Sequence, residues 1–281
     1  MKKLIDKIKN LSLALGAGML FAIKPAGKHR VWHGNLKKYD YAHRGLHNSK
    51  LGILENTIPA FDQAVKHGYG IELDVHLTRD DKLVVFHDNT LERACKTKRK
   101  VKDLSLEELQ SYGLFGTEET MPEFSQVLKN VQGRVPLVIE LKTVESPRDN
   151  TYKRLCSRVL EELECYRGEY CLESFDPRVL MWLRKNKPEI VRGQLMEHFR
   201  RHGSKVNKVY NFLARNLFFN FLTKPDFIAY QYLDRDCLAM YLAKKLYGIQ
   251  EVSWTVRDAD TARFLKGEGA LVIFEGYHNE A

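Results

Sequence analysis

Nine short apolar runs, separated for the most part by segments of helical periodicity, restrict the fold of this 281-residue chain more than any other feature. The runs lie near residues 39–43, 70–75, 83–86, 135–141, 169–174, 190–194, 226–230, 250–255 and 270–274. Apolar residues recur at helical spacing in 57–67, 122–131, 151–164, 177–186, 234–247 and 258–266. Strands that alternate with helices form a parallel sheet with right-handed crossovers. The sequence therefore predicts an α/β protein.

Charged side chains interrupt the second apolar run. Glu72 and Asp74 are two residues apart there, so on a strand they point to the same face. Two carboxylates on one face repel each other unless a cation lies between them, and such oxygen ligands suit Mg²⁺ or Ca²⁺. The alternative is an edge strand whose Glu72 and Asp74 simply face water.

Two histidines stand at the ends of the first and third runs. Histidine exchanges protons near neutral pH, so His43 and His87 are candidate acid and base groups. Arg44 follows His43 and offers a planar fork of donors that matches phosphate oxygens. Together with a cation site, these are the parts of a metal-assisted phosphodiester hydrolase.

The order and spacing of four motifs carry a resemblance to a known family. The motifs are His43-Arg44-Gly45, Glu55-Asn56-Thr57, Glu72-Leu73-Asp74 and His87-Asp88. In this order they resemble the glycerophosphodiester phosphodiesterase family, and the resemblance extends over residues 39–274. The run Leu137–Lys142 is similar to that family's next strand, and Ser174-Phe175-Asp176 and Trp254-Thr255-Val256 match weaker signatures.

The resemblance implies a TIM (β/α)8 barrel, a fold of roughly 250 residues. One of the nine runs is then an accessory strand. We expect a small insertion near 88–121 and a basic, aromatic insertion near 196–224. The expected domains are a basic and apolar N-terminal segment, 1–37, and a barrel domain, 38–281.

The resemblance also implies roles for site residues. Glu72, Asp74 and Glu140 would hold one divalent cation, Mg²⁺ or Ca²⁺, while His43 and His87 would act as acid and base. Which histidine plays which part stays open. Phosphate or substrate contacts would come from Arg44, Lys142, Glu55 and Trp254, the last as an apolar wall. Glu55 could instead support a neighbouring side chain, and Lys142 could instead form a salt bridge with the carboxylates.

The implied activity is metal-dependent cleavage of glycerophosphodiesters to sn-glycerol 3-phosphate and an alcohol. A lysophospholipase D-type lipid phosphodiesterase and a non-catalytic membrane-associated barrel are the alternatives. The chain departs from the family pattern at Arg257 and at Ile273–Tyr277, both on late strands and expected to lie away from the metal and histidine motifs. These departures concern the specificity pocket.

Positive charge is concentrated in two segments of the chain. The net charge is +9; residues 1–40 carry +7 and residues 196–224 carry +5, which leaves −3 for the rest. The thirteen-residue apolar run Leu11–Ile23 is too short for a confident span of about twenty residues. Basic residues mixed with large aromatics suit an anionic membrane surface, and both segments could dock the barrel mouth against lipid. The alternative is a helical lid over the barrel.

Five cysteines without a Cys-x-x-Cys pair argue for a reducing compartment. We therefore expect a cytoplasmic location, with peripheral attachment to the inner membrane face as an extension of the docking hypothesis. No nucleic-acid recognition motif is present. The preferred head group and the oligomeric state are left open by the sequence.

Overall fold

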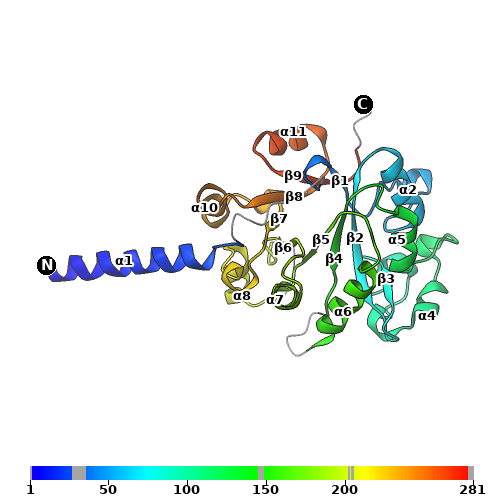
Figure 1. Ribbon diagram of the computed structural model, residues 1–281, viewed down its shortest axis with the longest axis horizontal. Coiled ribbons are helices and arrows are strands. Elements are labelled where there is room, and N and C mark those ends of the chain that lie inside the picture. The colour runs from blue at the N-terminus through cyan, green and yellow to red at the C-terminus, as the bar shows by residue number, and fades with distance from the viewer. Residues whose placement is uncertain (1, 27–35, 145–148, 202, 204–205, 278–281) are drawn as a thin grey trace.

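A closed barrel of eight parallel strands forms the centre of the computed structural model, which describes residues 2–26, 36–144, 149–201, 203 and 206–277 (Figure 1). Strand β1 pairs with both β2 and β9, which closes the barrel and confirms the predicted TIM fold. The strands are β1 (Tyr41–Ala42), β2 (Gly70–Leu77), β4 (Leu137–Leu141), β5 (Tyr170–Ser174), β6 (Arg192–Met196), β7 (Phe227–Gln231), β8 (Gln250–Val256) and β9 (Leu271–Phe274).

The third apolar run, near 83–86, forms the accessory strand β3 (Leu83–Val85), which pairs antiparallel with β2. The chain reverses at Asp81, whose φ of 60° is left-handed. The Phe86 amide then donates a hydrogen bond to the Asp74 carbonyl at 3.0 Å. This return brings His87 back beside the end of β2.

Helices enclose the barrel on its outer side. They are α2 (Ile58–Lys66), α5 (Phe124–Val131), α6 (Thr151–Leu163), α7 (Pro177–Asn186), α8 (Lys208–Arg215), α9 (Asn220–Thr223), α10 (Leu238–Tyr247) and α11 (Ala259–Gly267). The largest apolar cluster joins β2 and β4 to α2, α5, α6 and α7, with Phe61, Leu73, Val127 and Ile139 fully buried. The alternation predicted from the sequence is therefore satisfied by burial between two layers.

Large rings opposite glycines fill the barrel interior. Tyr41 is level with Gly70, and Phe227 is level with Gly193. A Cβ atom on Gly193 would lie 2.1 Å from the Phe227 ring, so only glycine fits there. These residues lie at the strand starts, where the barrel is a packed core, so a site is expected at the strand ends.

The insertion predicted near 88–121 is present between β3 and α5. It contains α3 (Glu92–Cys95) and α4 (Leu106–Gln110), and a capping box of Ser105 and Glu108 begins α4. Short 3₁₀ turns complete the chain at η1 (Leu36–Lys38), η2 (Ser49–Leu51), η3 (Val101–Asp103), η4 (Leu114–Gly116) and η5 (Tyr232–Asp234). The insertion has its own apolar cluster, which includes Leu91, Leu104 and Leu109.

The segment 196–224, predicted as an insertion, supplies the helices α8 and α9 that connect β6 to β7. It therefore takes the place of the crossover helix that the barrel requires between these strands. Phe199 and Leu217 are buried there, and Tyr210, Phe218 and Phe219 pack against the same cluster. Most of its aromatic residues thus contribute to the core.

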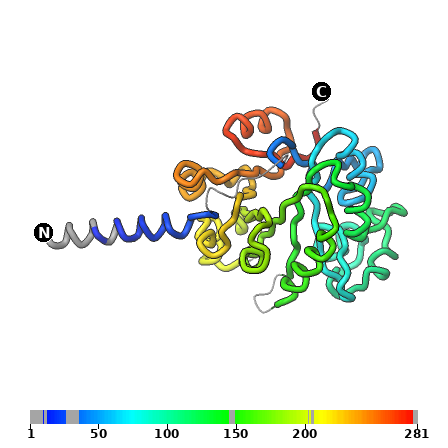
Figure 2. Tube along the Cα trace, viewed as in Figure 1, coloured from blue at the N-terminus to red at the C-terminus, as the bar shows by residue number. Residues whose placement is uncertain are grey.

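The first helix, α1 (Lys2–Ala22), projects away from the barrel (Figures 1 and 2). Over the described residues, no helix combines the length and apolar character needed to cross a membrane. The five cysteines are all unpaired thiols.

Candidate active site

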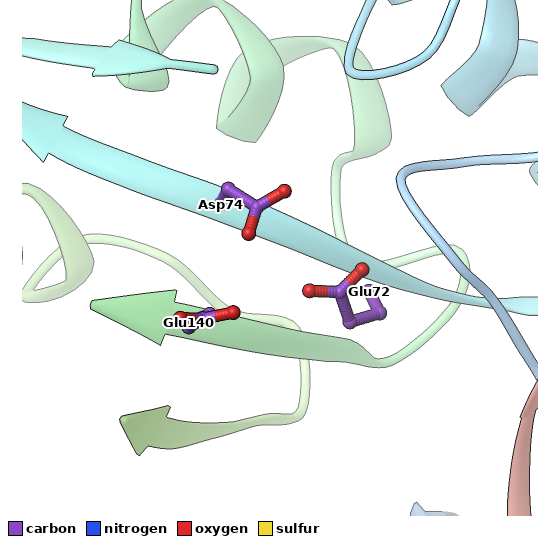
Figure 3. A group of neighbouring side chains, drawn as sticks. All are labelled: Glu72, Asp74 and Glu140. Carbon is purple, nitrogen blue, oxygen red and sulfur yellow. The ribbon is translucent and has the colours of Figure 1, made fainter. Parts of the chain in front are cut away.

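Three carboxylates meet at the ends of β2 and β4 (Figure 3). Glu72, Asp74 and Glu140 are buried, and each offers one oxygen within 4.8 Å of the others. Because β2 is paired with β1, β3 and β4, the edge-strand interpretation of Glu72 and Asp74 is wrong. Barrel closure turns this face inward, where ionised groups need counter-charges.

A fourth buried carboxylate, Glu173 on β5, is level with Glu140 in the sheet. Its Oε2 atom has no hydrogen-bond partner. Lys142 places its ammonium 3.0 Å from Asp74 and 2.9 Å from Glu140. Arg44 and Lys142, both partly buried, are the cations beside this cluster, so four ionised carboxylates would share two positive charges. The residual charge of −2 is what a divalent cation would balance.

The pKa values reflect this imbalance. Burial raises the pKa of Glu72 well above its usual range, and Asp74 and Glu140 add to the effect by repulsion. Burial also opposes ionisation of Asp74, but Lys142, His87 and Arg44 hold its pKa well below the usual range. Burial likewise raises the pKa of Glu173 well above normal. The donor set and its excess negative charge therefore fit a hard divalent cation.

Arg44 is fixed by backbone and side chain together. Its φ of 56° is left-handed, and its amide donates to Glu72 Oε2 at 2.9 Å. Its guanidinium donates to Glu55 at 2.8 Å and lies 3.7 Å from Asp74. The next residue must be glycine, because a Cβ on Gly45 (φ 79°) would lie 2.9 Å from Ala60.

The Glu55 carboxylate accepts hydrogen bonds from two arginines. Arg44 and Arg93 both donate to its carboxylate, Arg93 at 2.6 and 3.1 Å. Burial opposes ionisation, but these donors lower the pKa of Glu55 below normal. Its oxygens are engaged by the chain, which favours a supporting role over contact with a substrate hydroxyl.

Asn56 binds the Asp74 carboxylate from the other side. Its side-chain amide donates to Asp74 Oδ2 at 2.8 Å, and its own backbone is left-handed with φ 55°. Two adjacent loops thus carry non-glycine residues in strained conformations, each of which aims a donor at the carboxylate cluster.

His43 is bound to Glu275, which follows β9. Its Nδ1 lies 3.0 Å from Glu275 Oε2, and its Nε2 lies 4.0 Å from Glu72 Oε2. The expectation that the 273–277 departure lies away from the histidine motifs is therefore wrong. Closure of β1 against β9 brings together residues that are 232 positions apart.

Burial lowers the pKa of His43 to about 4, although the bond to Glu275 opposes this. The same bond lowers the pKa of Glu275 to about 2. At neutral pH an uncharged imidazole therefore donates its Nδ1 proton to an ionised carboxylate. The lone pair on Nε2 is directed into the site.

His87 has the same arrangement with a different carboxylate. Its Nδ1 lies 2.6 Å from Asp88 Oδ1, and Arg93 donates to the other oxygen of Asp88 at 2.7 Å. Burial opposes ionisation of Asp88, but His87 and Arg93 hold its pKa far below normal. Both histidines are thus oriented through Nδ1 and leave Nε2 available.

An aromatic wall stands on the opposite side of the barrel end. The half-buried Trp254 donates its indole N–H to the Ala229 carbonyl at 2.9 Å. Phe175 packs edge-on against it, with ring centroids 5.7 Å apart, and Phe199 packs on Phe175 at 5.8 Å. The Arg257 side chain is exposed, and it donates a hydrogen bond to Glu275 at 3.2 Å.

Sequence reasoning assigned no role to Asn56, Asp88, Arg93, Glu173 or Glu275. Asn56 and Asp88 lie inside recognised motifs, so their position was a usable signal. Glu173 directly precedes the Ser174 signature on a buried strand. Arg93 and Glu275 reach the site through loop return and barrel closure. Glu275 lies in the Ile273–Tyr277 departure from the family pattern, but nothing local in the sequence pairs it with His43.

Known proteins resemble the chain over most of its length. Residues 43–274 match the sequence pattern of the Glycerophosphoryl diester phosphodiesterase family. The chain is 30% identical to the YhdW protein of Bacillus subtilis (strain 168), whose glycerophosphodiester phosphodiesterase name is provisional, over 85% of this chain and 94% of that protein. A human lysophospholipase D is 37% identical over 31% of this chain and 28% of its own length.

Solved structures share the fold. A glycerophosphodiester phosphodiesterase from Thermotoga maritima superposes with a TM-score of 0.62 at 25% identity, over 84% of this chain and 94% of its own. An Oleispira antarctica phosphodiesterase, solved with the product sn-glycerol-3-phosphate, gives a TM-score of 0.67 at 21% identity, over 84% and 92% of the two chains.

Proposed function

The chain belongs to the glycerophosphoryl diester phosphodiesterase family, and we propose that it hydrolyses glycerophosphodiesters to sn-glycerol 3-phosphate and an alcohol with the aid of one divalent cation. The observation that carries this proposal is the buried cluster of Glu72, Asp74 and Glu140, flanked by two carboxylate-bound histidines. Residues 38–281 form the proposed catalytic domain. The unpaired cysteines favour a cytoplasmic location.

Glu72, Asp74 and Glu140 would hold the cation. When bound, Mg²⁺ or Ca²⁺ supplies Lewis-acid stabilisation of a phosphate oxygen that gains negative charge. The chain's contribution is a preformed set of three oxygens, fixed by Arg44 N–H and Asn56. Lys142, which bridges Asp74 and Glu140, keeps these carboxylates from separating and adds positive charge beside the phosphate.

Arg44 would bind the remaining phosphate oxygens. Its guanidinium is held by Glu55 through Nη1, while its buried Nε lies 3.7 Å from Asp74 Oδ2 and makes no hydrogen bond. An unpartnered donor in a buried site is costly unless a ligand completes it. A phosphate oxygen is the acceptor that the proposed substrate offers.

His43 and His87 would move the two protons of the reaction. Hydrolysis requires one group to accept a proton from the attacking hydroxyl and another to protonate the leaving alcohol. Glu275 and Asp88 fix the Nδ1 protons, so the Nε2 atoms are the exchange positions. Trp254 and Phe175 would form the apolar side of the glycerol site.

The test is hydrolysis of glycerophosphocholine and glycerophosphoethanolamine with Mg²⁺, Ca²⁺ or EDTA. Wild type should release glycerol 3-phosphate in a metal-dependent manner, and His43→Ala should lose this activity. His67→Ala is the matched control, since His67 is exposed at the end of α2. Equal activity of wild type and His43→Ala, or full activity in EDTA, would contradict the mechanism.

The human lysophospholipase D match supplies a second candidate of the same chemistry. Lysophosphatidylcholine is the discriminating substrate. Release of an acylated glycerol phosphate, with no turnover of the two water-soluble diesters, would move the assignment to a lysophospholipase D. Turnover of none of the three substrates would favour the non-catalytic, membrane-associated barrel.

A further inference from the structure

The C-terminal end of α1 and the following residue, together residues 20–23, which we call its root, pack against the flank of the barrel formed by α8, α9 and α10. Ile23 is fully buried in the cluster that joins α8 and α10, and Asn220 donates to its carbonyl at 2.9 Å. Tyr247, at the end of α10, donates to the Leu20 carbonyl at 2.8 Å. Phe21 packs on Phe221 with ring centroids 5.8 Å apart. The projecting helix is therefore held at a defined place.

Beyond this root, α1 has no packing partner among the described residues. Every side chain from residue 13 to residue 18 is exposed, and Leu13 and Leu15 are 78% and 66% accessible. The sequence from Leu11 to Ile23 is apolar all round apart from Ser12. A helix with apolar residues on every side requires an apolar surrounding in which to bury them.

The flank around the root also gathers exposed apolar side chains. Of the 14 large hydrophobic residues exposed within the described chain, nine lie on α1 and on α8–α10. Besides those of α1, they are Val209 and Phe212 on α8, Leu222 on α9, and Leu238, Tyr241 and Leu246 on α10. Concentration of apolar surface in one region marks an interaction surface.

The same region carries the positive charge of the molecule. Residues 1–26 contribute +4, residues 197–224 contribute +5 and residues 238–247 contribute +2, which leaves −2 for the rest of the chain. Lys224 lies 6.0 Å from the centre of the Phe21 ring, so basic and aromatic groups are interleaved at the root. This combination complements an anionic lipid surface.

We propose that α1 and the flank formed by α8, α9 and α10 bind the surface of an anionic bilayer, with the apolar run of α1 buried at the boundary between the headgroups and the acyl chains. Thirteen apolar residues extend about 20 Å along a helix, less than the roughly 30 Å of a hydrocarbon core. Lysines at positions 2, 3, 7 and 9 precede the run and Lys24 follows it, so both ends stay with the headgroups.

This arrangement differs from docking of the barrel mouth against lipid. The Ala26 amide donates to the Pro225 carbonyl at 3.0 Å, immediately before β7, so α1 enters at the strand starts. The carboxylates and histidines stand at the strand ends. A bilayer on the flank leaves the active site open to water beside the membrane, where it can accept water-soluble diesters.

Flotation of the full-length protein with vesicles tests the proposal. Phosphatidylcholine vesicles containing phosphatidylglycerol should carry the protein upward, and pure phosphatidylcholine should carry much less. Leu13→Glu/Leu15→Glu should lower partitioning about tenfold or more, since it places two charges in the apolar run. Phe212→Glu should weaken it less. Phe264→Glu, on the remote helix α11, is the control at 61% exposure and should equal wild type.

Hydrolysis of a water-soluble substrate should be unchanged in all of these variants, which separates this proposal from the catalytic one. Absence of flotation by wild type would overturn the proposal, as would equal flotation of Leu13→Glu/Leu15→Glu and wild type. Light scattering gives a third outcome. A dimer that dissociates in Leu13→Glu/Leu15→Glu, without vesicle binding by wild type, would assign the surface to a second copy of the chain.

Discussion

The β2–β5 side of the barrel and the β6–β7 side are joined by one ladder of strand pairing, but the first buries carboxylates and the second buries apolar groups. Successive ladder partners run from Asp74 through Glu140 and Glu173 to Gly193 and Phe227. The first three are carboxylates with too few counter-charges, and the last two are a close-packed glycine and ring. One side is therefore suited to bind charge, and the other supplies the packing that holds it in place.

The largest expected effect separates activity from stability on the carboxylate side. Glu72→Gln removes one carboxylate ligand of the proposed cation site and should lower the rate of hydrolysis at least about 100-fold. Loss of a residue that only supports a metal ligand typically lowers activity about 10- to 100-fold. In EDTA the same variant should melt at a higher temperature than wild type, because it removes a carboxyl group whose ionisation is opposed by burial first and by Asp74 and Glu140 second. Glu161→Gln on exposed α6 is the control. A lower melting temperature would contradict the charge imbalance.

The next effect concerns the pairing of β1 with β9, which closes the barrel beside the carboxylate side. Glu275→Gln keeps the shape beside His43 but weakens the acceptor for its Nδ1 proton, so kcat should fall about 10- to 100-fold. The pH dependence of kcat should also shift to lower pH, because the ionised Glu275 raises the pKa of His43 and an amide does so less. Arg257→Gln, which leaves Glu275 in place, should have a smaller effect. An unchanged pH profile in Glu275→Gln would show that Glu275 does not position His43.

A substitution on the packed side should act on stability alone. Gly193→Ala would force a methyl group to within 2.1 Å of the Phe227 ring and should cost about 1–3 kcal/mol of unfolding free energy. The folded fraction should retain its kcat. Gly193→Ala/Phe227→Leu should recover part of the loss, as denaturant unfolding can measure. A loss of kcat in folded Gly193→Ala would show that the two sides are not separable.

The last expected effect is a pH dependence on the carboxylate side, which appears only below neutral pH. Burial lowers the pKa of His76 on β2 to about 4, and its Nε2 lies 3.2 Å from the His87 carbonyl. As the pH falls below about 6.5, the unfolded chain gains a proton that the folded chain does not, so stability decreases toward pH 4. Between pH 7.5 and 5, His76→Gln should lose less stability than wild type, by on the order of 2 kcal/mol. Equal losses would contradict a buried neutral His76.

Much of the site follows from local patterns. Glu72 and Asp74 share a face because strands have a period of two, and Glu140 lies level with Asp74 because β2 and β4 are parallel neighbours. Local patterns said less about which side chains form ion pairs with one another. They offered a salt bridge with the carboxylates as one alternative for Lys142, which the structure shows, but they did not indicate that Arg93 holds Glu55.

The sequence by itself determined the alternation of strands and helices, the accessory strand, the family motifs and the uneven charge. These depend on residue type and short spacing, which the chain carries whatever its final shape. Tertiary structure decided the pairing of His43 with Glu275, the orphaned Glu173 oxygen and the entry of α1 at the strand starts. Each of these depends on barrel closure or on packing between distant segments, and such non-local contacts leave no periodic signal in the sequence.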